Sequence, residues 1–67
     1  MPKVSIIIPA YNEEAFIGKL LECILQVDIR SIGFEREVIV VDNGSHDRTS
    51  EIVKQFAEVC LFRIEVN

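Results

Sequence analysis

The spacing of apolar residues changes along the chain, and it predicts three strands. Residues 4–9 (VSIIIP) form a β-branched run ended by a proline, which is typical of a strand buried on both faces. Residues 38–41 (VIVV) have the same character and predict a second buried strand. Residues 61–66 (LFRIEV) mix apolar residues with Arg63 and Glu65, which predicts a third strand with one exposed face or an edge position.

The first of two segments between these strands has the period of an amphipathic helix. Its apolar residues recur at i, i+1, i+4 and i+5, and the predicted helix runs from residue 13 to about Val27. Asn12 is a suitable N-cap, and Glu13 and Glu14 would then lie in the first turn, where carboxylates favour the helix dipole. The helix would bury Phe16, Ile17, Leu20, Leu21, Ile24 and Leu25.

The second predicted helix follows a polar turn at residues 42–45 (DNGS), in which Gly44 would supply a positive φ. Ser45 or Asp47 would cap this helix. Its buried residues would be Ile52, Val53, Phe56 and Ala57, with Cys60 at its end. Cys23 and Cys60 both fall at apolar helical positions, which favours two small buried side chains in a reduced compartment over a disulfide or a reactive thiol.

The order of these elements predicts an α/β fold. Buried strands that alternate with helices imply a parallel sheet with right-handed crossovers, here β-α-β-α-β with the strands in the order 3-2-1. This is an incomplete sheet, one half of a doubly wound, Rossmann-like fold. Such folds bind ligands at the carboxyl ends of the strands. The turns at residues 9–14 and 42–47 should converge there.

Composition narrows the functional classes. The chain has 67 residues, 49% of them hydrophobic and 27% charged, which fits one small globular domain. Its net charge is −4 and its seven basic residues are scattered, so a nucleic-acid partner is disfavoured. No apolar run approaches the roughly 18 residues of a membrane span, and no signal peptide is recognised, so we expect a cytoplasmic chain.

The polar turns can be explained by helix capping, but some of their residues allow other roles. Tyr11 could pack on the first helix or line a ligand groove. Glu13 and Glu14 are more typical of dipole partners than of a metal site, and His46 of an exposed turn residue than of a catalytic base. Neither a G-x-G-x-x-G loop nor a G-x-x-x-x-G-K-[ST] loop is present, which disfavours a classical dinucleotide or P-loop site.

Two longer motifs resemble a known family. VSIIIPAYNEEAFIGKLLECIL followed by EVIVVDNGSHDRTSEIV is similar to the start of family 2 glycosyltransferases, inverting enzymes with the GT-A fold. The usual pattern is a buried strand, P-[AT]-Y-N-E and an amphipathic helix, then V-V-D-D-G-S-x-D-x-T at the start of a second helix. The resemblance spans nearly the whole chain, and it implies that residues 1–67 are the nucleotide-sugar-binding portion at the N-terminus of a longer glycosyltransferase domain.

The resemblance implies roles for the matching residues. Pro9, Ala10 and Tyr11 would line the pocket for the base and ribose, and Glu13 would reach the ribose or base. Asp42 would close the second strand, and Asn43 would meet the base edge. No catalytic or metal-binding residue is predicted within the chain.

The chain also departs from the family pattern. Asn43 stands where an acid is usual, His46 and Arg48 replace the commoner Thr and Gly, and the loop at residues 28–37 is longer. The family's D-x-D and its catalytic base lie beyond the matched region, so we expect the chain alone to be inactive. A divalent metal, Mg²⁺ or Mn²⁺, is expected only in the full-length enzyme.

Asn43 suggests which nucleotide is bound. An asparagine side chain offers one acceptor and one donor, which complements uracil or thymine better than guanine. The partner expected from the sequence is therefore a UDP- or dTDP-linked sugar. The apolar edge of the first strand would favour a homo-oligomer. Two alternatives remain: a truncated, non-catalytic α/β module that self-associates, and an unrelated small α/β domain such as a flavodoxin-like one.

Overall fold

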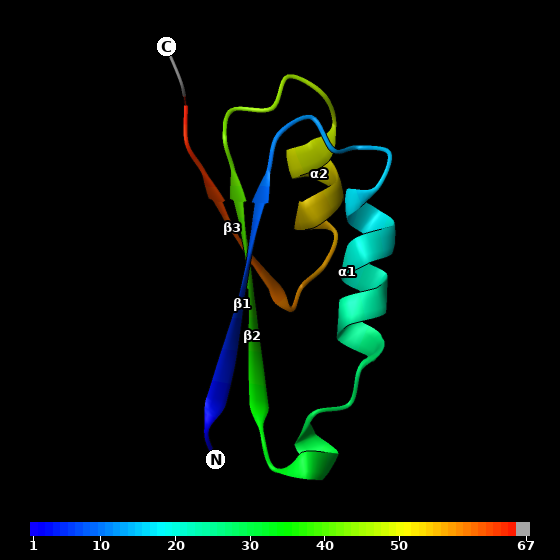
Figure 1. The fold of residues 1–67 in the computed structure, drawn as a ribbon. Coiled ribbons are helices and arrows are strands. Elements are labelled where there is room, and N and C mark those ends of the chain that lie inside the picture. Colours follow the sequence, from blue (N-terminus) through cyan, green and yellow to red (C-terminus); the bar gives the residue numbers. More distant parts are fainter. Residues whose placement is uncertain (66–67) are drawn as a thin grey trace.

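A computed structural model describes residues 1–65 as three parallel strands and two helices (Figure 1). The elements follow in the order β1 (Lys3–Ala10), α1 (Ile17–Gln26), a 3₁₀ turn (Arg30–Ile32), β2 (Glu35–Asp42), α2 (Thr49–Lys54) and β3 (Val59–Arg63). The strands lie in the order β1-β2-β3, each paired in parallel with its neighbour. The predicted α/β fold, its connectivity and its strand order are therefore confirmed.

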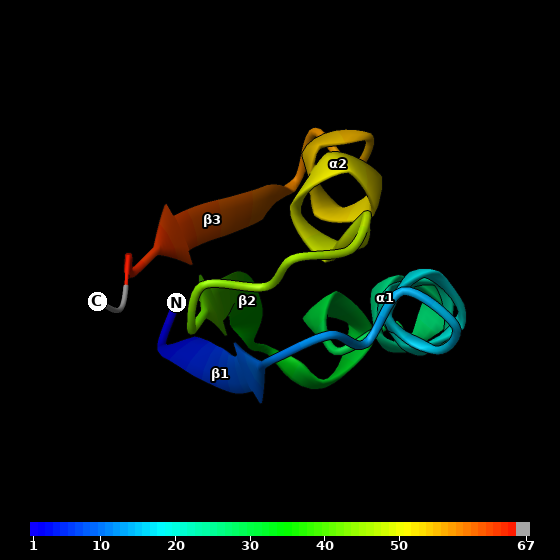
Figure 2. The same cartoon turned by 90° about the horizontal axis from the view of Figure 1, so that it is seen from above.

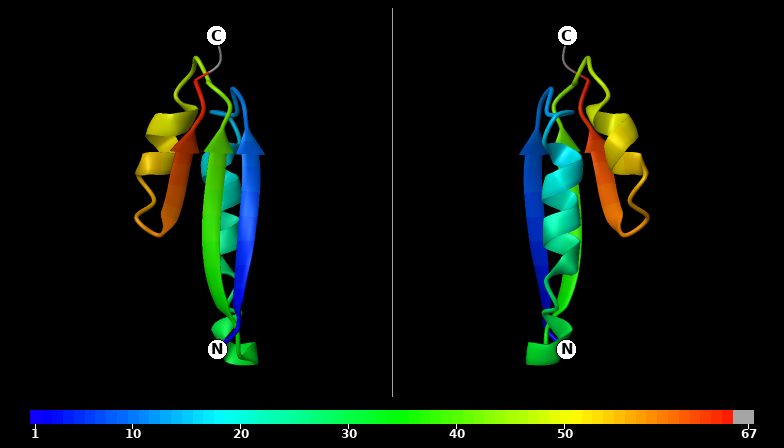
Figure 3. Two further views of the ribbon diagram at one scale, coloured as in Figure 1. Left: turned by 90° about the vertical axis from the view of Figure 1, so that its left-hand side faces the viewer. Right: turned by 90° about the vertical axis from the view of Figure 1, so that its right-hand side faces the viewer.

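Both helices cover the same face of the sheet (Figure 2). Figure 3 shows α1 over β1 and β2, and α2 beside β3. Two successive right-handed crossovers that proceed in the same direction across a sheet place their helices on one side. The core lies between these two layers, and its fully covered apolar side chains are Ala10, Ile17, Leu21, Val38, Val40 and Val53.

The prediction that the first two strands are buried on both faces is wrong for the residues that the structure describes. Val38 and Val40 point toward the helices and are buried, whereas Ile7 is 63% exposed on the other side of the sheet. The register aligns Ile7 with Ile39, and Val41 with Phe62, which is 60% exposed. We refer to Ile7, Ile39, Val41 and Phe62 as the open face. The strand sequences are apolar on both faces of the sheet, but the two helices cover one of these faces.

Several element boundaries differ from the prediction. The first helix begins at Ile17 instead of residue 13, and the second ends at Lys54, so Phe56 and Ala57 lie beyond it. The third strand begins at Val59, includes Cys60 and ends at Arg63, so the predicted strand residues Ile64 and Glu65 lie beyond it, and residue 66 lies outside the described residues. Cys23 and Cys60 are free and exposed, so the prediction that both are buried is wrong.

The outer edge of β1 has a defined pattern of backbone groups. The N–H of Glu35 donates to the carbonyl of Pro2, and the N–H of Asn43 donates to the carbonyl of Ala10. Even-numbered groups of β1 thus face β2, and by the alternation of a parallel ladder the odd-numbered groups face outward. Pro9 falls on this outward series, where the absence of an N–H costs no hydrogen bond within the sheet.

Candidate functional site: two interlocked turns at the carboxyl ends of β1 and β2

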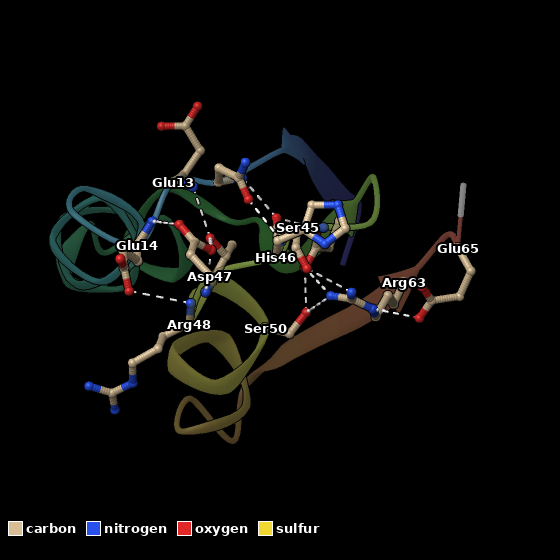
Figure 4. Close-up of polar contacts among 12 residues, drawn as sticks. Glu13, Glu14, Ser45, His46, Asp47, Arg48, Ser50, Arg63 and Glu65 are labelled. Carbon is tan, nitrogen blue, oxygen red and sulfur yellow. Dashed lines mark hydrogen bonds and ion pairs between the residues drawn. The ribbon is translucent and has the colours of Figure 1, made fainter. Parts of the chain in front are cut away.

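The turn after β1 (residues 11–16) and the turn after β2 (residues 43–48) lie against each other and exchange hydrogen bonds (Figure 4). The strands are parallel and adjacent, so both turns leave the sheet at the same end. The convergence predicted from the sequence is confirmed. The bonds join residues more than thirty positions apart, and they make the two turns one structural unit.

Asn12 is the centre of the first group of contacts. Its N–H donates to Ser45 Oγ at 2.8 Å, and its Oδ1 accepts from the N–H of His46 at 2.8 Å. The backbone of Asn12 is left-handed, with φ 51°, a conformation that asparagine tolerates better than most residues. The prediction that Asn12 caps α1 is wrong, because its side-chain oxygen is engaged by the other turn and the helix begins five residues later.

Glu13 and Glu14 extend the contact between the turns. The N–H of Glu13 donates to Thr49 Oγ1 at 2.8 Å, and the N–H of Glu14 donates to Asp47 Oδ2 at 3.2 Å. In return, Glu14 Oε2 accepts from the N–H of Arg48 at 3.3 Å. The two glutamates precede α1, whose first turn contains no acidic residue, so their predicted role as partners of its dipole is wrong.

Asp47 and Thr49 connect the second turn to α2. Asp47 Oδ1 accepts from the N–H of Thr49, the first residue of α2, at 2.9 Å, and it also accepts from the Thr49 hydroxyl. Burial would raise the pKa of Asp47, but the hydrogen bonds from Thr49 and from Glu14 outweigh it and lower that pKa. Of the two predicted caps, Asp47 binds the start of the helix, whereas Ser45 bonds to Asp42 and Asn12.

The carboxylate of Asp42 lies fully buried beneath the second turn. Its Oδ1 accepts from the N–H of Ser45 at 2.9 Å and from the Ser45 hydroxyl at 2.6 Å, and its Oδ2 accepts from the Ser50 hydroxyl and from Arg63 Nη1 at 3.1 Å. Burial alone would raise the pKa of Asp42, but the hydrogen bonds from Ser45 and Ser50 and the charge of Arg63 lower it. Asp42 therefore stays ionised in the core.

The residues predicted to bind a nucleotide occupy different environments. Pro9, Ala10 and Glu13 line one cavity of about 210 Å³ beside α1, together with Ile8, Phe16, Ile17 and Leu20. Asn43 is exposed and is not one of the lining residues, and its N–H donates to the carbonyl of Ala10 at 2.9 Å. Tyr11 is 51% exposed and lies outside the set of residues that line this cavity. The structure thus brings Pro9, Ala10 and Glu13 together, joins Asn43 to them through the backbone, and buries Asp42 below.

A larger cavity of about 440 Å³ lies at the opposite end of the sheet, where Lys3 and Glu35 begin their strands. It is far from the interlocked turns, and its lining mixes acidic and basic side chains. One of these, Arg36, is already engaged: its Nη1 donates to the carbonyl of Ile24 at 3.0 Å, and its Nη2 to that of Leu25 at 3.2 Å. These bonds close the carboxyl end of α1, so Arg36 is a capping residue.

Arg63 and Ser50 belong to the site, although no sequence motif marks either of them as a functional residue. In the sequence, Arg63 is one of the scattered basic residues, on the polar side of the predicted third strand. In the structure Arg63 pairs with Asp42 in the register of β2 and β3. Counting in steps of two from Val59 and Leu61, which pack against the core, places Arg63 on the face of Asp42 and could have identified it.

Comparison with known proteins identifies the family. The model of glycosyl transferase family 2 matches residues 5–67, nearly the whole chain and both turns. The chain belongs to glycosyl transferase family 2. The family resemblance inferred from the two motifs is confirmed, and the alternative of an unrelated small α/β domain is wrong.

Curated relatives of this family 2 chain in bacteria and archaea carry the names of glycosyltransferases. An undecaprenyl-phosphate 4-deoxy-4-formamido-L-arabinose transferase of Pseudomonas paraeruginosa is 44% identical over 55 residues, which cover 82% of this chain and 16% of the relative. The probable glycosyltransferase YdaM of Bacillus subtilis is 43% identical over 58 residues, covering 87% of this chain and 13% of the relative. Glycosyltransferase AglE of Haloferax volcanii is 46% identical over 57 residues, which cover 85% of this chain and 18% of the relative.

The family 2 chain spans less than a fifth of the length of these curated relatives. By resemblance the chain is part of a glycosyltransferase, and the residues that match the family model include the two interlocked turns. Within residues 1–65, no three His, Cys, Asp or Glu side chains gather in a group that could hold a metal ion. In the same part of the chain, no helix has both the length and the apolar character needed to cross a membrane.

Proposed function

We propose that the chain is the portion of an inverting glycosyltransferase that binds the nucleotide-diphosphate sugar donor. The observation that carries this proposal is the interlocking of the two turns beside the cavity of Pro9, Ala10 and Glu13. Four hydrogen bonds join the two turns, and a fifth joins Glu13 to Thr49 at the start of α2, which holds the backbone of Glu13 at the rim of that cavity. A preformed rim lowers the entropic cost of binding.

The proposed nucleotide contacts are the base and ribose against Pro9, Ala10 and Tyr11, the ribose or base against Glu13, and the base edge against Asn43. Asn43 is exposed, which leaves it accessible to a ligand and supports this assignment. Its side chain offers one donor and one acceptor, so uracil or thymine is the favoured base and guanine is disfavoured. Asp42 contributes indirectly, since its carboxylate is occupied by four donors in the core.

Calorimetric titration with UDP, dTDP and GDP tests this proposal, on the 67-residue chain and on a longer enzyme that contains it. We expect UDP or dTDP to bind more tightly than GDP. The variant Asn43→Asp replaces the donor with a second acceptor and should narrow or reverse that preference. Gln26→Glu, at the exposed carboxyl end of α1, adds the same single negative charge away from the turns and is the matched control. Tightest binding of GDP by the unmodified protein would refute the choice of base.

Catalysis requires groups that the proposal assigns to the remainder of a longer enzyme. These are the base that deprotonates the acceptor hydroxyl and a D-x-D that holds Mg²⁺ or Mn²⁺ against the diphosphate. Such an enzyme would work in the cytoplasm or on the cytoplasmic face of a membrane. The 67-residue chain should bind donor without transferring sugar. Measurable transfer by the purified chain, in the presence of Mn²⁺ and acceptor, would contradict this division of roles.

A second candidate function is that of a non-catalytic module that self-associates. It is favoured by the outward edge of β1 and by the open face, where Ile7 and Phe62 are more than half exposed. Unpaired strand edges and exposed apolar surface both favour contact with a second chain. We therefore propose that the 67-residue chain forms a homo-oligomer through the edge of β1. A monomer in sedimentation at micromolar concentration would argue against it.

A further inference from the structure

Arg63 bridges β3 to the turn after β2 (Figure 4). Its Nη1 donates to Asp42 Oδ2 at 3.1 Å and to Ser50 Oγ at 3.0 Å, and its Nη2 donates to the carbonyl of Ser45 at 2.7 Å. Its Nε donates to Glu65 at 2.7 Å at the outer end of the strand. One side chain therefore contacts the strand end, the turn and the first residues of α2.

These contacts leave Arg63 little capacity to bind a ligand itself. A guanidinium has five N–H donors, and the four hydrogen bonds use four of them. Both donors of Nη1 point at buried partners, Asp42 and Ser50. An arginine at the ligand-binding end of a sheet is often taken as a phosphate contact, but this one is directed inward, at the base of the turn.

The contacts hold the backbone on both sides of Asn43. On the near side, Asp42 is held in the core by its ion pair with Arg63. On the far side, Ser45 is held through its carbonyl by Arg63 and through its N–H by Asp42. Asn43 itself adds one backbone bond to Ala10. Its side chain remains exposed, on a segment whose two ends are fixed.

We propose that Arg63 is a positioning residue for nucleotide recognition, which fixes the turn at residues 43–45 so that Asn43 presents its amide to the base. The statement about recognition rests on the proposed function; the statement about the turn does not. A lysine cannot replace this arrangement, because one ammonium cannot reach three acceptors in the planar fork of a guanidinium. Loss of Arg63 would leave Asp42 as a buried charge without its cation.

Nuclear magnetic resonance of the 67-residue chain tests the effect on the turn. The heteronuclear NOE and the hydrogen exchange of residues 43–45 would be compared in the unmodified chain, Arg63→Lys and Arg63→Gln. We expect Ser45 N–H exchange to accelerate on the order of tenfold in Arg63→Gln, because its acceptor Asp42 loses a partner. Arg30→Gln is the matched control, since it removes the same charge from an exposed residue of the 3₁₀ turn, at the opposite end of the sheet. It should leave the turn at residues 43–45 unchanged.

Chemical rescue separates positioning from general destabilisation. In Arg63→Ala, millimolar guanidinium should restore slow Ser45 exchange, while sodium at equal ionic strength should not. If Arg63→Gln is too unstable to study, Arg63→Lys keeps the positive charge and tests the loss of the fork alone. A turn that stays as rigid in Arg63→Lys and in unrescued Arg63→Ala as in the unmodified chain would overturn the proposal.

Nucleotide titration of the same variants separates this inference from the proposed function. Weaker UDP or dTDP binding by Arg63→Lys, on the order of tenfold, together with a loosened turn, supports both. If the unmodified protein binds no nucleotide but its turn loosens without Arg63, the proposed function fails and the positioning of the turn stands. If the turn loosens and affinity is unchanged, the role of Arg63 in recognition is refuted while donor binding stands.

Discussion

Asp42 and Arg63 pair across β2 and β3, and Arg63 Nη1 lies 3.1 Å from the Oδ2 of a carboxylate with no solvent exposure. A buried charge is tolerated when it has a counter-ion and enough hydrogen bonds, and Asp42 has both. The pair lies where the sheet ends and the turns begin. The most polar part of the core therefore supports the part of the molecule proposed to recognise a ligand.

The first prediction concerns the loss of folding stability at low pH. The folded-state pKa of Asp42 is lowered from its usual value of 3.8, so the stability that its ionised form contributes is complete above about pH 4 and is lost as the pH falls through the lowered folded pKa. Asp42→Asn should cost roughly 2–4 kcal/mol at pH 7, because an amide presents donors to donors. Urea denaturation from pH 7 to pH 3 should show this difference shrinking with acid.

Asp47 serves as a control for that experiment. Its pKa is also lowered, but it lies at the surface of the turns, so Asp47→Asn should remove a smaller part of the acid sensitivity. A difference between the unmodified chain and Asp42→Asn that stays constant from pH 7 to pH 3 would show that the Asp42 carboxylate is not the acid-sensitive group.

The second prediction concerns the interlock at Thr49, whose fully buried side chain accepts from the N–H of Glu13 and donates to Asp47. Thr49→Val keeps the shape of the side chain and removes both bonds. We expect a loss of about 1–3 kcal/mol in the free energy of unfolding. Thr49→Ser keeps the hydroxyl and should lose less. Equal losses in thermal unfolding of the two variants would mean that packing of the methyl group contributes as much as the bonds.

The third prediction concerns the left-handed backbone of Asn12. Asn12→Ala and Asn12→Gly both remove the acceptor of the His46 N–H, but only alanine has a Cβ that is strained at φ 51°. The glycine variant should therefore be more stable than the alanine variant by about 1 kcal/mol. Chemical denaturation of the pair measures this difference directly. The opposite order would indicate that flexibility of the unfolded chain outweighs the strain.

The sheet could be predicted from the sequence, because buried β-branched runs and alternating helices allow few topologies. The hydrogen-bond partners of the turn residues were harder to predict. Asn12 and Glu13 carry the composition of a helix start, and nothing local distinguishes a side chain that caps its own helix from one that bonds to another turn. That distinction depends on the adjacency of β1 and β2, which brings residues 12 and 45 together.

The prediction that the strands are buried on both faces failed for a different reason. Ile7 and Phe62 are apolar, and an apolar residue in a strand is normally taken as buried. Whether it is covered depends on which face of the sheet receives the helices, and both crossovers here lie on the other face (Figure 2). Arg63 was missed for a related reason, since its importance lies in its register with Asp42 and not in any local motif.

The last prediction distinguishes two routes to self-association. Ile7 belongs both to the outer strand β1 and to the open face, whereas Phe62 belongs to the open face but lies on β3. If chains pair through β1 of one copy and β1 of the other, Ile7→Lys should dissociate the oligomer, because a lysine on the pairing edge strand opposes that contact. Phe62→Lys, on the opposite edge strand β3, should not. If sheets pack face to face, both substitutions should dissociate it, since each buries a charge in the interface. Sedimentation velocity at several micromolar concentrations separates the two patterns. An oligomer that survives both substitutions would exclude both routes and direct attention to two other exposed side chains, Phe16 at the start of α1 and Leu20 within it.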